Sequence, residues 1–277
     1  MNNLKKGLEL LQNPKLNKGT AFSNEERKKF HLQGLLPVVE ETIDDQLKRI
    51  NHHLATKKSG LGQYIYLTSL LDRNETLFFK TLMSDPSRFV PIMYDPVVGE
   101  ACLKFSEIYR KNNGMYISLK DKGRIKQVLE NWPVKDIRFI CVSSGGRILG
   151  LGDLGANGMG IPLGKLQLYT ACAAIPPDGL LPLLLDSGTD NDALLNDEFY
   201  IGLREKRPST QELDEFVKEF VDAVQNVFPG CCIHFEDWKG TDAIRLLAEY
   251  KDKILCYVIM TIFKERELLL SQEYMVH

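Results

Sequence analysis

The spacing of apolar residues divides the chain into a mostly helical first part and a mixed second part. Residues 24–37 predict a helix, with Asn24 as its N-cap, acidic residues in its first turn and a stop between Gly34 and Pro37. Apolar residues recur at helical intervals in three further segments, 42–56, 61–85 and 95–114. We therefore expect the N-terminal region to be built mainly from helices.

From about Ile137 the period of the pattern changes. Short apolar runs bounded by turn residues predict buried strands at 137–144, 180–186 and 231–237. Residues 209–230 predict an amphipathic helix, capped by Ser209 or Thr210, before the last of these strands. Strands that alternate with helices and end on polar residues are the layout in which α/β proteins bind ligands. The predicted fold class is α/β with a mostly helical N-terminal region.

Composition argues against two classes of partner. The 277 residues are 44% hydrophobic and 26% charged, which is enough for one large or two modest cores. A formal net charge of -2, with the two signs interspersed, gives no global field that would attract nucleic acid or an acidic membrane surface. We expect neither nucleic acid nor a membrane among the partners.

The cysteines indicate a reducing compartment. There are six of them, and neither a secretory segment after Met1 nor a long apolar run accompanies them. Cys231 and Cys232 are adjacent but lack C-x-x-C or metal-ligand spacing, so we interpret them as buried structural residues. The predicted location is the cytoplasm.

The stretch "ILGLGDLGANGMGIPLGK", residues 148–165, contains a G-x-G-x-x-G pattern at Gly150, Gly152 and Gly155. A dinucleotide-binding loop joins a strand directly to a helix, whereas here a hairpin signal at 144–146 and a second apolar run, expected to be a strand, intervene. The candidate acid, Asp186, also lies well past the expected distance. A phosphate-binding P-loop is excluded as well, because Leu166 stands where Ser or Thr would hold magnesium.

The alternative is a loop whose glycines let the backbone turn tightly and approach a ligand. On this interpretation Arg147, Asp153, Asn157 and Lys165 face the ligand, or Asp153 and Asn157 brace the loop from behind. Without further context, Lys165 would equally be a surface residue at a helix start.

The segment "SSGGRILGLGDLGANGMGIPLGKLQLYTACAA" closely resembles the signature of malic enzymes. Further segments resemble that family in the same order, among them "FVPIMYDPVVGEAC", "DSGTDNDALLNDEFYIGLR" and "IHFEDWKGTDAIRLLAEYKDKILCY". The resemblance implies the amino-acid-dehydrogenase-like N-terminal domain of malic enzymes. It also implies oxidative decarboxylation of L-malate to pyruvate and CO2, with NAD or NADP and with Mg2+ or Mn2+.

The resemblance assigns roles to five residues. Lys165 matches the general base, and burial beside a divalent cation would favour its neutral amine. Tyr94 matches the acid that protonates enolpyruvate, although alone it would be interpreted as a packing aromatic. Arg147 matches the residue that grips a malate carboxylate, a task suited to its two-pronged guanidinium. Glu236 and Asp237 match metal ligands, and their oxygens suit a hard cation.

Other matches and departures also matter. Glu41, Arg49 and Arg73 fall where some family members bind fumarate as an activator, with surface ion pairing as the alternative. The chain departs from the family at three positions near the predicted site, where Asp95 replaces a threonine, Ser144 an aspartate and Gly146 a glutamate. A divergent branch of the family is one interpretation of these changes.

The end of the chain departs most. Codons for Ile259–Arg266 can be written ATA ATG ACG ATA TTC AAG GAA CGG, and a shifted frame of these bases spells Asn-Asp-Asp-Ile-Gln-Gly-Thr, the string with which the family continues. That string carries another metal-binding aspartate and leads into the dinucleotide domain. Our hypothesis is that a frameshift produced the residues after about Tyr257, and we expect the chain alone to be inactive because it lacks the cofactor half.

Three domains are predicted: a helical, dimer-forming region at 1–130, a malate- and metal-binding α/β domain at 131–257, and an atypical tail at 258–277. The expected assembly is a homodimer or homotetramer, and the mitochondrial matrix is the alternative location. Two other functions stay open. One is a noncatalytic dicarboxylate-binding or subunit-assembly module, and the other is an independent dinucleotide-binding domain.

Overall fold

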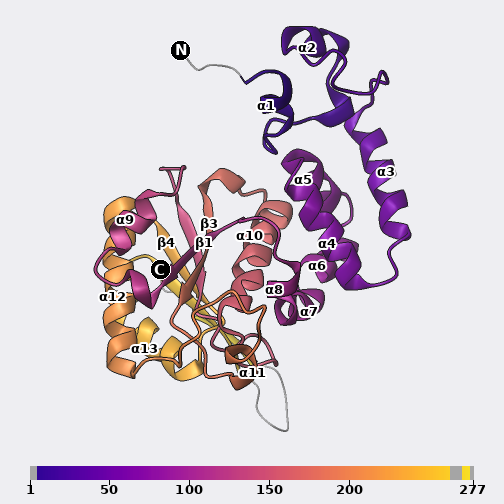
Figure 1. The fold of residues 1–277 in the computed structure, drawn as a ribbon. Coiled ribbons are helices and arrows are strands. Elements are labelled where there is room, and N and C mark those ends of the chain that lie inside the picture. Colours follow the sequence, from indigo (N-terminus) through magenta and orange to yellow (C-terminus); the bar gives the residue numbers. More distant parts are fainter. Residues whose placement is uncertain (1–4, 263–269, 275–277) are drawn as a thin grey trace. The chain divides into compact units, whose positions relative to one another are not determined.

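The computed structural model describes residues 5–262 and 270–274. The chain forms two compact units (Figure 1). The helical unit comprises residues 1–97 with 171–173, and the sheet unit comprises 98–170 with 174–277. Residues 98–130 thus belong to the sheet unit. The domain boundaries that the sequence suggests, at residues 130 and 257, remain predictions.

Short amphipathic helices build the helical unit, as the sequence predicts. They are α1 (Gly7–Leu11), α2 (Asn24–Lys29), α3 (Ile43–Ala55), α4 (Gly60–Leu71), α5 (Glu75–Ser84) and α6 (Pro86–Met93). The predicted cap of α2 is wrong by one residue. Ser23 is the N-cap, because its Oγ accepts a hydrogen bond from the Glu26 N–H at 3.2 Å while the Glu26 carboxylate accepts one from the Ser23 N–H.

A mainly parallel sheet forms the centre of the other unit. Its strand order is β1-β3-β2-β4-β5-β6, with all pairs parallel except β5 and β6. The strands are β1 (Met115–Ser118), β2 (Phe139–Ser143), β3 (Leu180–Asp186), β4 (Cys232–Glu236), β5 (Cys256–Ile262) and β6 (Leu270–Tyr274). The α/β fold class and the predicted strands at 137–144, 180–186 and 231–237 are confirmed. The strands β1, β5 and β6 were not predicted from the sequence.

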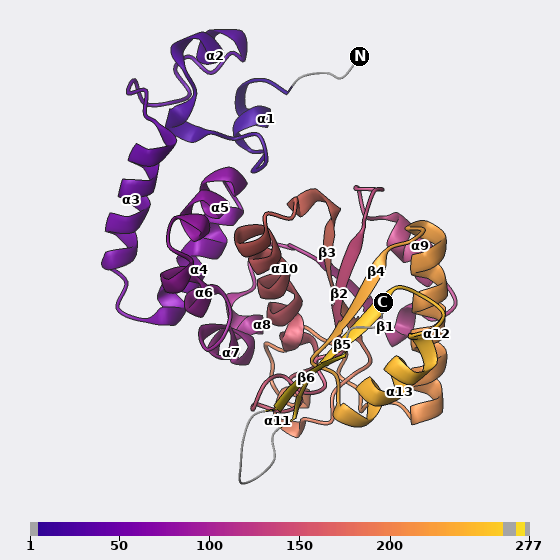
Figure 2. The same cartoon turned by 180° about the vertical axis from the view of Figure 1, so that it is seen from behind.

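Helices cover both faces of this sheet (Figures 1 and 2). One face is covered by α10 (Gly160–Ala173), and the opposite face by α9 (Ile125–Glu130), α12 (Thr210–Val227) and α13 (Gly240–Tyr250). Shorter helical segments complete the described elements: α7 (Val97–Leu103), α8 (Phe105–Ile108), α11 (Asp192–Leu195) and the 3-10 turns Gly19–Ala21, Leu119–Asp121, Gly155–Met159 and Pro177–Gly179. Of the two predicted caps for α12, Ser209 and Thr210, Ser209 is the N-cap.

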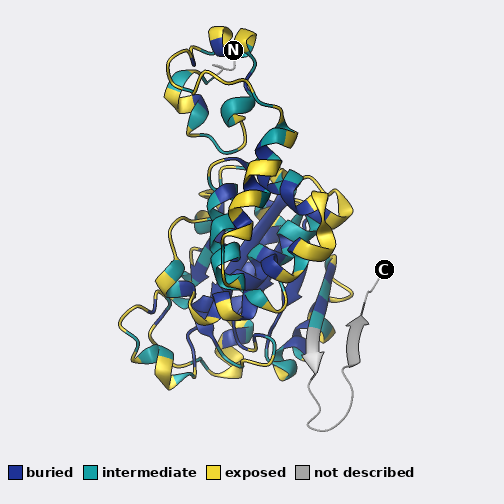
Figure 3. Cartoon of the chain, turned by 90° about the vertical axis from the view of Figure 1, so that its right-hand side faces the viewer, coloured by how far each residue is buried: buried dark blue, intermediate teal, exposed yellow. Residues whose placement is uncertain are grey.

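Alternation along the strands sorts apolar from polar residues. Figure 3 shows the strands of the sheet as mostly buried. Val142 and Phe235 belong to the same core cluster as Phe216 and Phe220 of α12, and all four are fully buried. Burying each such side chain stabilises the fold by about 1.5–3 kcal/mol. The neighbouring strand positions face α10 instead, and in β4 they include the titratable pair His234 and Glu236.

The order of the strands places a topological switch point between β2 and β4. The connection from β2 leads through α10 to β3 on one side, and β4 lies on the other side of β2. Their following loops meet, because the Arg147 N–H donates to the Asp237 carbonyl at 3.2 Å and the Trp238 indole N–H donates to the Val142 carbonyl at 3.0 Å. Such a reversal of strand order is where open α/β sheets bind ligands.

One sequence expectation about the glycine-rich segment is wrong. The run after residue 146 is not a strand, because only a single antiparallel bridge joins Ile148 to Gly152. The backbone turns there, with positive φ at Leu149 (46°) and Gly152 (83°), which interrupts a pleated strand. The long distance from these glycines to the candidate acid, Asp186, still disfavours a dinucleotide-binding loop.

Other expectations have mixed outcomes. All six cysteines are free, and Cys231 and Cys232 are buried as predicted. The frameshift hypothesis concerns Ile259–Arg266, and the part of this string from residue 263 onward lies outside the described residues. No helix among residues 5–262 or 270–274 combines the length and apolar character needed to cross a bilayer.

Candidate active site

Lys165 and Glu236 form a buried ion pair at the carboxyl edge of the sheet. The Lys165 ammonium comes from the second turn of α10, and its Nζ lies 2.9 Å from Oε1 of Glu236, the last residue of β4. The two side chains are only 16% and 3% exposed. Two charges held this close in a sheltered place interact strongly, since little water screens them.

Glycines allow the start of α10 to pack closely on the loop after β2 and on α7. A Cβ on Gly158 would lie 2.7 Å from the Cα of Gly145, and one on Gly160 would lie 2.7 Å from Sγ of Cys102. Both contacts are shorter than packed atoms tolerate. The glycine-rich stretch therefore serves helix packing, which brings Lys165 to the strand ends.

His234 contacts the same carboxylate from the opposite side. Its Nε2 pairs with Oε2 of Glu236, and its Nδ1 lies 3.3 Å from the hydroxyl of Tyr169 on α10. Burial lowers the pKa of His234, against the opposing effect of Glu236. Burial alone would raise the pKa of Glu236, but His234 and Lys165 outweigh it and the net pKa is lowered. Glu236 is therefore ionised beside a neutral imidazole near neutral pH.

Asp237 follows Glu236 and is also buried, at 3% exposed. Its backbone adopts a positive φ of 54°, a strained conformation for a residue other than glycine. Strain of this kind is frequent at functional sites. The side chain of Asp237 also acts on the neighbouring Cys102, where burial and the Asp237 charge together raise the pKa and keep the thiol protonated.

The two carboxylates fit a divalent cation in donor type but not in number. Carboxylate oxygens are what Mg2+ and Mn2+ prefer, and both side chains are withdrawn from solvent. Within residues 5–262 and 270–274, no group of three or more His, Cys, Asp and Glu side chains is arranged to hold a metal. Glu236 and Asp237 would therefore supply part of a coordination shell.

Arg147 lies on the loop after β2 with an exposed side chain, and its backbone is hydrogen-bonded to Asp237. This contact brings the backbone of a cationic residue next to the backbone of Asp237. The two substituted positions, Ser144 and Gly146, belong to the same loop and are both buried. A Cβ on Gly146 would lie 3.3 Å from Cγ of Lys239, so a glutamate there would need Lys239 to shift.

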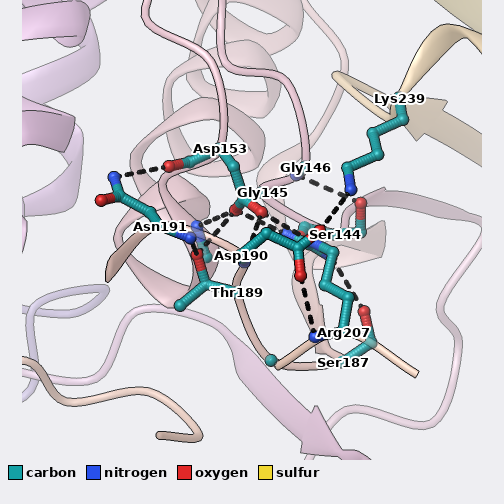
Figure 4. Close-up of polar contacts among 12 residues, drawn as sticks. Ser144, Gly145, Gly146, Asp153, Ser187, Thr189, Asp190, Asn191, Arg207 and Lys239 are labelled. Atoms are coloured by element: carbon teal, nitrogen blue, oxygen red, sulfur yellow. Dashed lines mark hydrogen bonds and ion pairs between the residues drawn. The ribbon is translucent and has the colours of Figure 1, made fainter. Parts of the chain in front are cut away.

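A second buried ion pair, Arg207 with Asp153, ties this loop to its neighbours (Figure 4). Nε of Arg207 lies 2.7 Å from Oδ2 of Asp153 and Nη2 lies 2.8 Å from Oδ1, a two-pronged contact. The guanidinium also donates to the Ser144 carbonyl and to the Ser187 hydroxyl.

Asp153 braces the glycine loop, as one sequence interpretation expects. Its carboxylate accepts hydrogen bonds from the Gly155 N–H and the Thr189 hydroxyl, at 3.0 and 2.9 Å. Burial would raise the pKa of Asp153, but the hydrogen bonds and charge of Arg207 outweigh that effect and lower it. Asn157 is buried too, and its side-chain oxygen accepts from the Ser106 hydroxyl.

The remaining predicted residues lie in the helical unit. Tyr94 ends α6 and is half-buried, and its role as an acid remains a prediction. Arg49 pairs with Glu41, which also accepts from the Thr20 hydroxyl. Arg73 lies against the ring of Tyr66, 5.6 Å from its centroid. The structure joins two members of the predicted effector site, and fumarate binding there remains a prediction.

Sequence reasoning missed Arg207, His234 and Tyr169. No local pattern marks Arg207, since its partner is 54 residues away. His234 carried a usable signal, because it lies two residues before Glu236 in a strand and therefore on the same face.

Comparisons with known proteins identify the family. The family "Malic enzyme, N-terminal domain" matches residues 71–251. The chain is 49% identical over 254 residues to NADP-dependent malic enzyme 1 of Arabidopsis thaliana, covering 91% of this chain and 43% of that protein. It is 46% identical over 251 residues to NAD-dependent malic enzyme 2 of Photobacterium profundum, covering 91% of this chain and 45% of that protein.

A solved structure of Entamoeba histolytica malic enzyme also matches. Identity is 16%, coverage is 82% of this chain and 38% of that one, and the TM-score is 0.32. The chain spans less than half the length of the two curated relatives above. On the family match and these identities, the chain belongs to the malic enzyme family.

Proposed function

We propose that this chain supplies the malate- and metal-binding half of an enzyme that converts L-malate to pyruvate and CO2, with NAD or NADP as the oxidant. The observation that carries the proposal is the 2.9 Å contact between Lys165 and Glu236 at the carboxyl edge of the sheet. An amine and a carboxylate held together with little exposure to solvent offer a base beside a cation ligand. Family membership supplies the class of reaction.

In this proposal Glu236 and Asp237 hold the divalent cation, with further ligands from elsewhere. The cation, Mg2+ or Mn2+, would polarise the malate hydroxyl and the later ketone, and the nicotinamide would accept the hydride from C2. Both carboxylates are buried, so their charge acts on a bound substrate with little screening by water.

The side chains of the chain itself handle substrate and protons. Arg147 binds a carboxylate of malate through its guanidinium. The proton of the Lys165 ammonium would be repelled by a cation bound at Glu236. The neutral amine then accepts the proton of the C2 hydroxyl as the C2–H bond breaks, which yields a ketone at C2. The C4 carboxylate then leaves as CO2, its bonding electrons form the enolate of pyruvate, and Tyr94 donates a proton to C3. Both proton transfers use a side chain of this chain, whereas the hydride goes to the nicotinamide.

The proposed location rests on the cysteine content, and the proposed assembly and effector site rest on the family resemblance. We place the protein in the cytoplasm, with the mitochondrial matrix as the alternative, and expect a homodimer or homotetramer in which the helical region contributes subunit contacts. Glu41, Arg49 and Arg73 are the proposed effector-binding residues, although the Glu41 carboxylate is already engaged with Thr20 and Arg49.

Calorimetric titration of the purified chain tests this function. L-malate, fumarate and NAD are added separately, each with and without Mn2+. We expect L-malate to bind only when Mn2+ is present. Fumarate binding without metal, in the absence of malate binding, would favour a noncatalytic dicarboxylate module, and NAD binding alone would favour an independent dinucleotide-binding domain.

A further inference from the structure

A line of polar groups runs behind the Lys165–Glu236 pair, on the face of the sheet that α10 covers; its two tyrosines are half-buried, and His234 and Glu236 are buried. It begins at Tyr257 on β5, whose hydroxyl lies 2.7 Å from the hydroxyl of Tyr169. Tyr169 in turn lies 3.3 Å from Nδ1 of His234, and Nε2 of His234 contacts Glu236. Neither tyrosine nor the histidine has a part in the proposed chemistry.

The imidazole is fixed in its plane as well as at its nitrogens. The ring of His234 stacks on that of Tyr257, with centroids 4.2 Å apart and planes 21° apart. Phe139 presents its ring in an edge-on arrangement, with centroids 6.1 Å apart. A ring packed on two sides has little freedom to rotate, so its nitrogens point in fixed directions.

Donor and acceptor counting fixes the arrangement of hydrogens. Nε2 of His234 and Oε2 of Glu236 are in contact, but their geometry is not that of a regular hydrogen bond. An ionised carboxylate only accepts hydrogen bonds, so a hydrogen on Nε2 is the arrangement that suits this contact. His234 is fully buried, which favours the neutral ring with one hydrogen, on Nε2. Nδ1 then accepts from the Tyr169 hydroxyl, whose oxygen accepts from Tyr257.

We propose that His234 is a positioning residue that holds the Glu236 carboxylate in the orientation in which Oε1 faces Lys165. Tyr169 and Tyr257 favour the tautomer with hydrogen on Nε2, which is the one that can donate to Glu236. This inference deepens the proposed function, on which it rests, because it names what orients the ligand carboxylate. Outer groups of this kind orient metal ligands, and their loss commonly weakens metal binding about 10- to 100-fold.

The first test observes the imidazole directly. The chain contains five histidines, so long-range proton–nitrogen NMR on 15N-histidine-labelled protein gives few signals, and His234→Gln identifies the one from His234. We expect a neutral ring with hydrogen on Nε2. Tyr169→Phe should shift the Nδ1 signal, whereas Tyr257→Phe, which keeps the stacked ring, should change it much less. A ring with hydrogen on Nδ1, or an Nδ1 signal unmoved by Tyr169→Phe, would overturn the inference.

The second test measures the consequence for the carboxylate. Binding of Mn2+ with L-malate present is followed by electron paramagnetic resonance for the unaltered chain, His234→Leu and His234→Gln. We expect about 10-fold weaker binding or more for leucine, and recovery to within a few-fold for glutamine, whose amide can donate to Glu236. Equal binding by the leucine variant and the unaltered chain would contradict the inference.

The two failures are distinguishable. If the unaltered chain binds no Mn2+, the metal site of the proposed function is wrong, and the ring-nitrogen signals still decide whether His234 is held as inferred. If His234→Leu does not fold, as judged by circular dichroism, Tyr169→Phe takes its place in the Mn2+ measurement. A several-fold loss for Tyr169→Phe with none for Tyr257→Phe then supports the inference, and no loss overturns it.

Discussion

Arg207 and Asp153 form a two-pronged ion pair, 2.7 and 2.8 Å long, between loops that come from different parts of the sequence. Their side chains are 9% and 13% exposed. Asp153 belongs to the glycine-rich segment that leads into α10, and the same segment carries Arg147. The pair therefore links the shape of the proposed substrate loop to the stability of the sheet unit.

Removing the charge of Asp153 should destabilise the fold. Asp153→Asn leaves Arg207 buried without its counterion, which costs about 3–5 kcal/mol. The matched control is Asp222→Asn, which removes an exposed partner of Lys218, with side chains 63% and 68% exposed. It should cost far less, because water screens an exposed pair. Urea unfolding at pH 7 measures both free energies, and equal losses would refute the structural role of the buried pair.

The same pair should give stability a definite dependence on pH. The pKa of Asp153 is lower in the folded chain than when unfolded, so its stabilisation is complete above the unfolded pKa of about 3.9. It is lost as pH falls through the lower, folded pKa. The stability difference between the unaltered chain and Asp153→Asn should be constant from about pH 7 to 5 and shrink below about pH 4. Urea unfolding across that pH range measures the difference in unfolding free energy between the two proteins. A difference that grows as the pH falls would disprove the prediction.

The turn after β2 should tolerate no side chain at Gly145. Its φ is +65°, and a Cβ there would lie 1.8 Å from the carbonyl oxygen of Gly155. Gly230 also has a positive φ, +76°, but open space around its Cβ position. Gly230→Ala should cost about 1–2 kcal/mol for conformation alone, and Gly145→Ala about 1–3 kcal/mol more for the clash. Thermal and urea unfolding compare the two; a smaller loss for Gly145→Ala would count against the described turn.

The elements that were predictable are those with a strong local pattern. Residues 180–186 form β3 with every position buried, so a continuous apolar run predicts it. The helix that follows Ser209 has a regular apolar stripe and a cap. By contrast β1, Met115–Ser118, is four residues long, and so short a run resembles a turn until a neighbouring strand pairs with it.

The candidate site was only partly predictable for a different reason. Lys165, Glu236 and Asp237 came from a resemblance that covers most of the chain, and the structure brings Lys165 and Glu236 together. Their supporting partners are contacts between distant segments: 65 residues separate Tyr169 from His234. Such pairs depend on the order of strands in the sheet, which periodicity alone does not reveal.

The central claim is that Glu236, beside Lys165, seats the cation that malate requires. Calorimetry of L-malate binding in saturating Mn2+ tests it with two variants, Glu236→Gln and the control Glu249→Gln, which removes an exposed glutamate paired with Lys253. We predict Mn2+-dependent binding that Glu236→Gln weakens at least about 10-fold and that Glu249→Gln leaves unchanged. Malate binding that needs no Mn2+, or that survives Glu236→Gln at full affinity, would contradict the account.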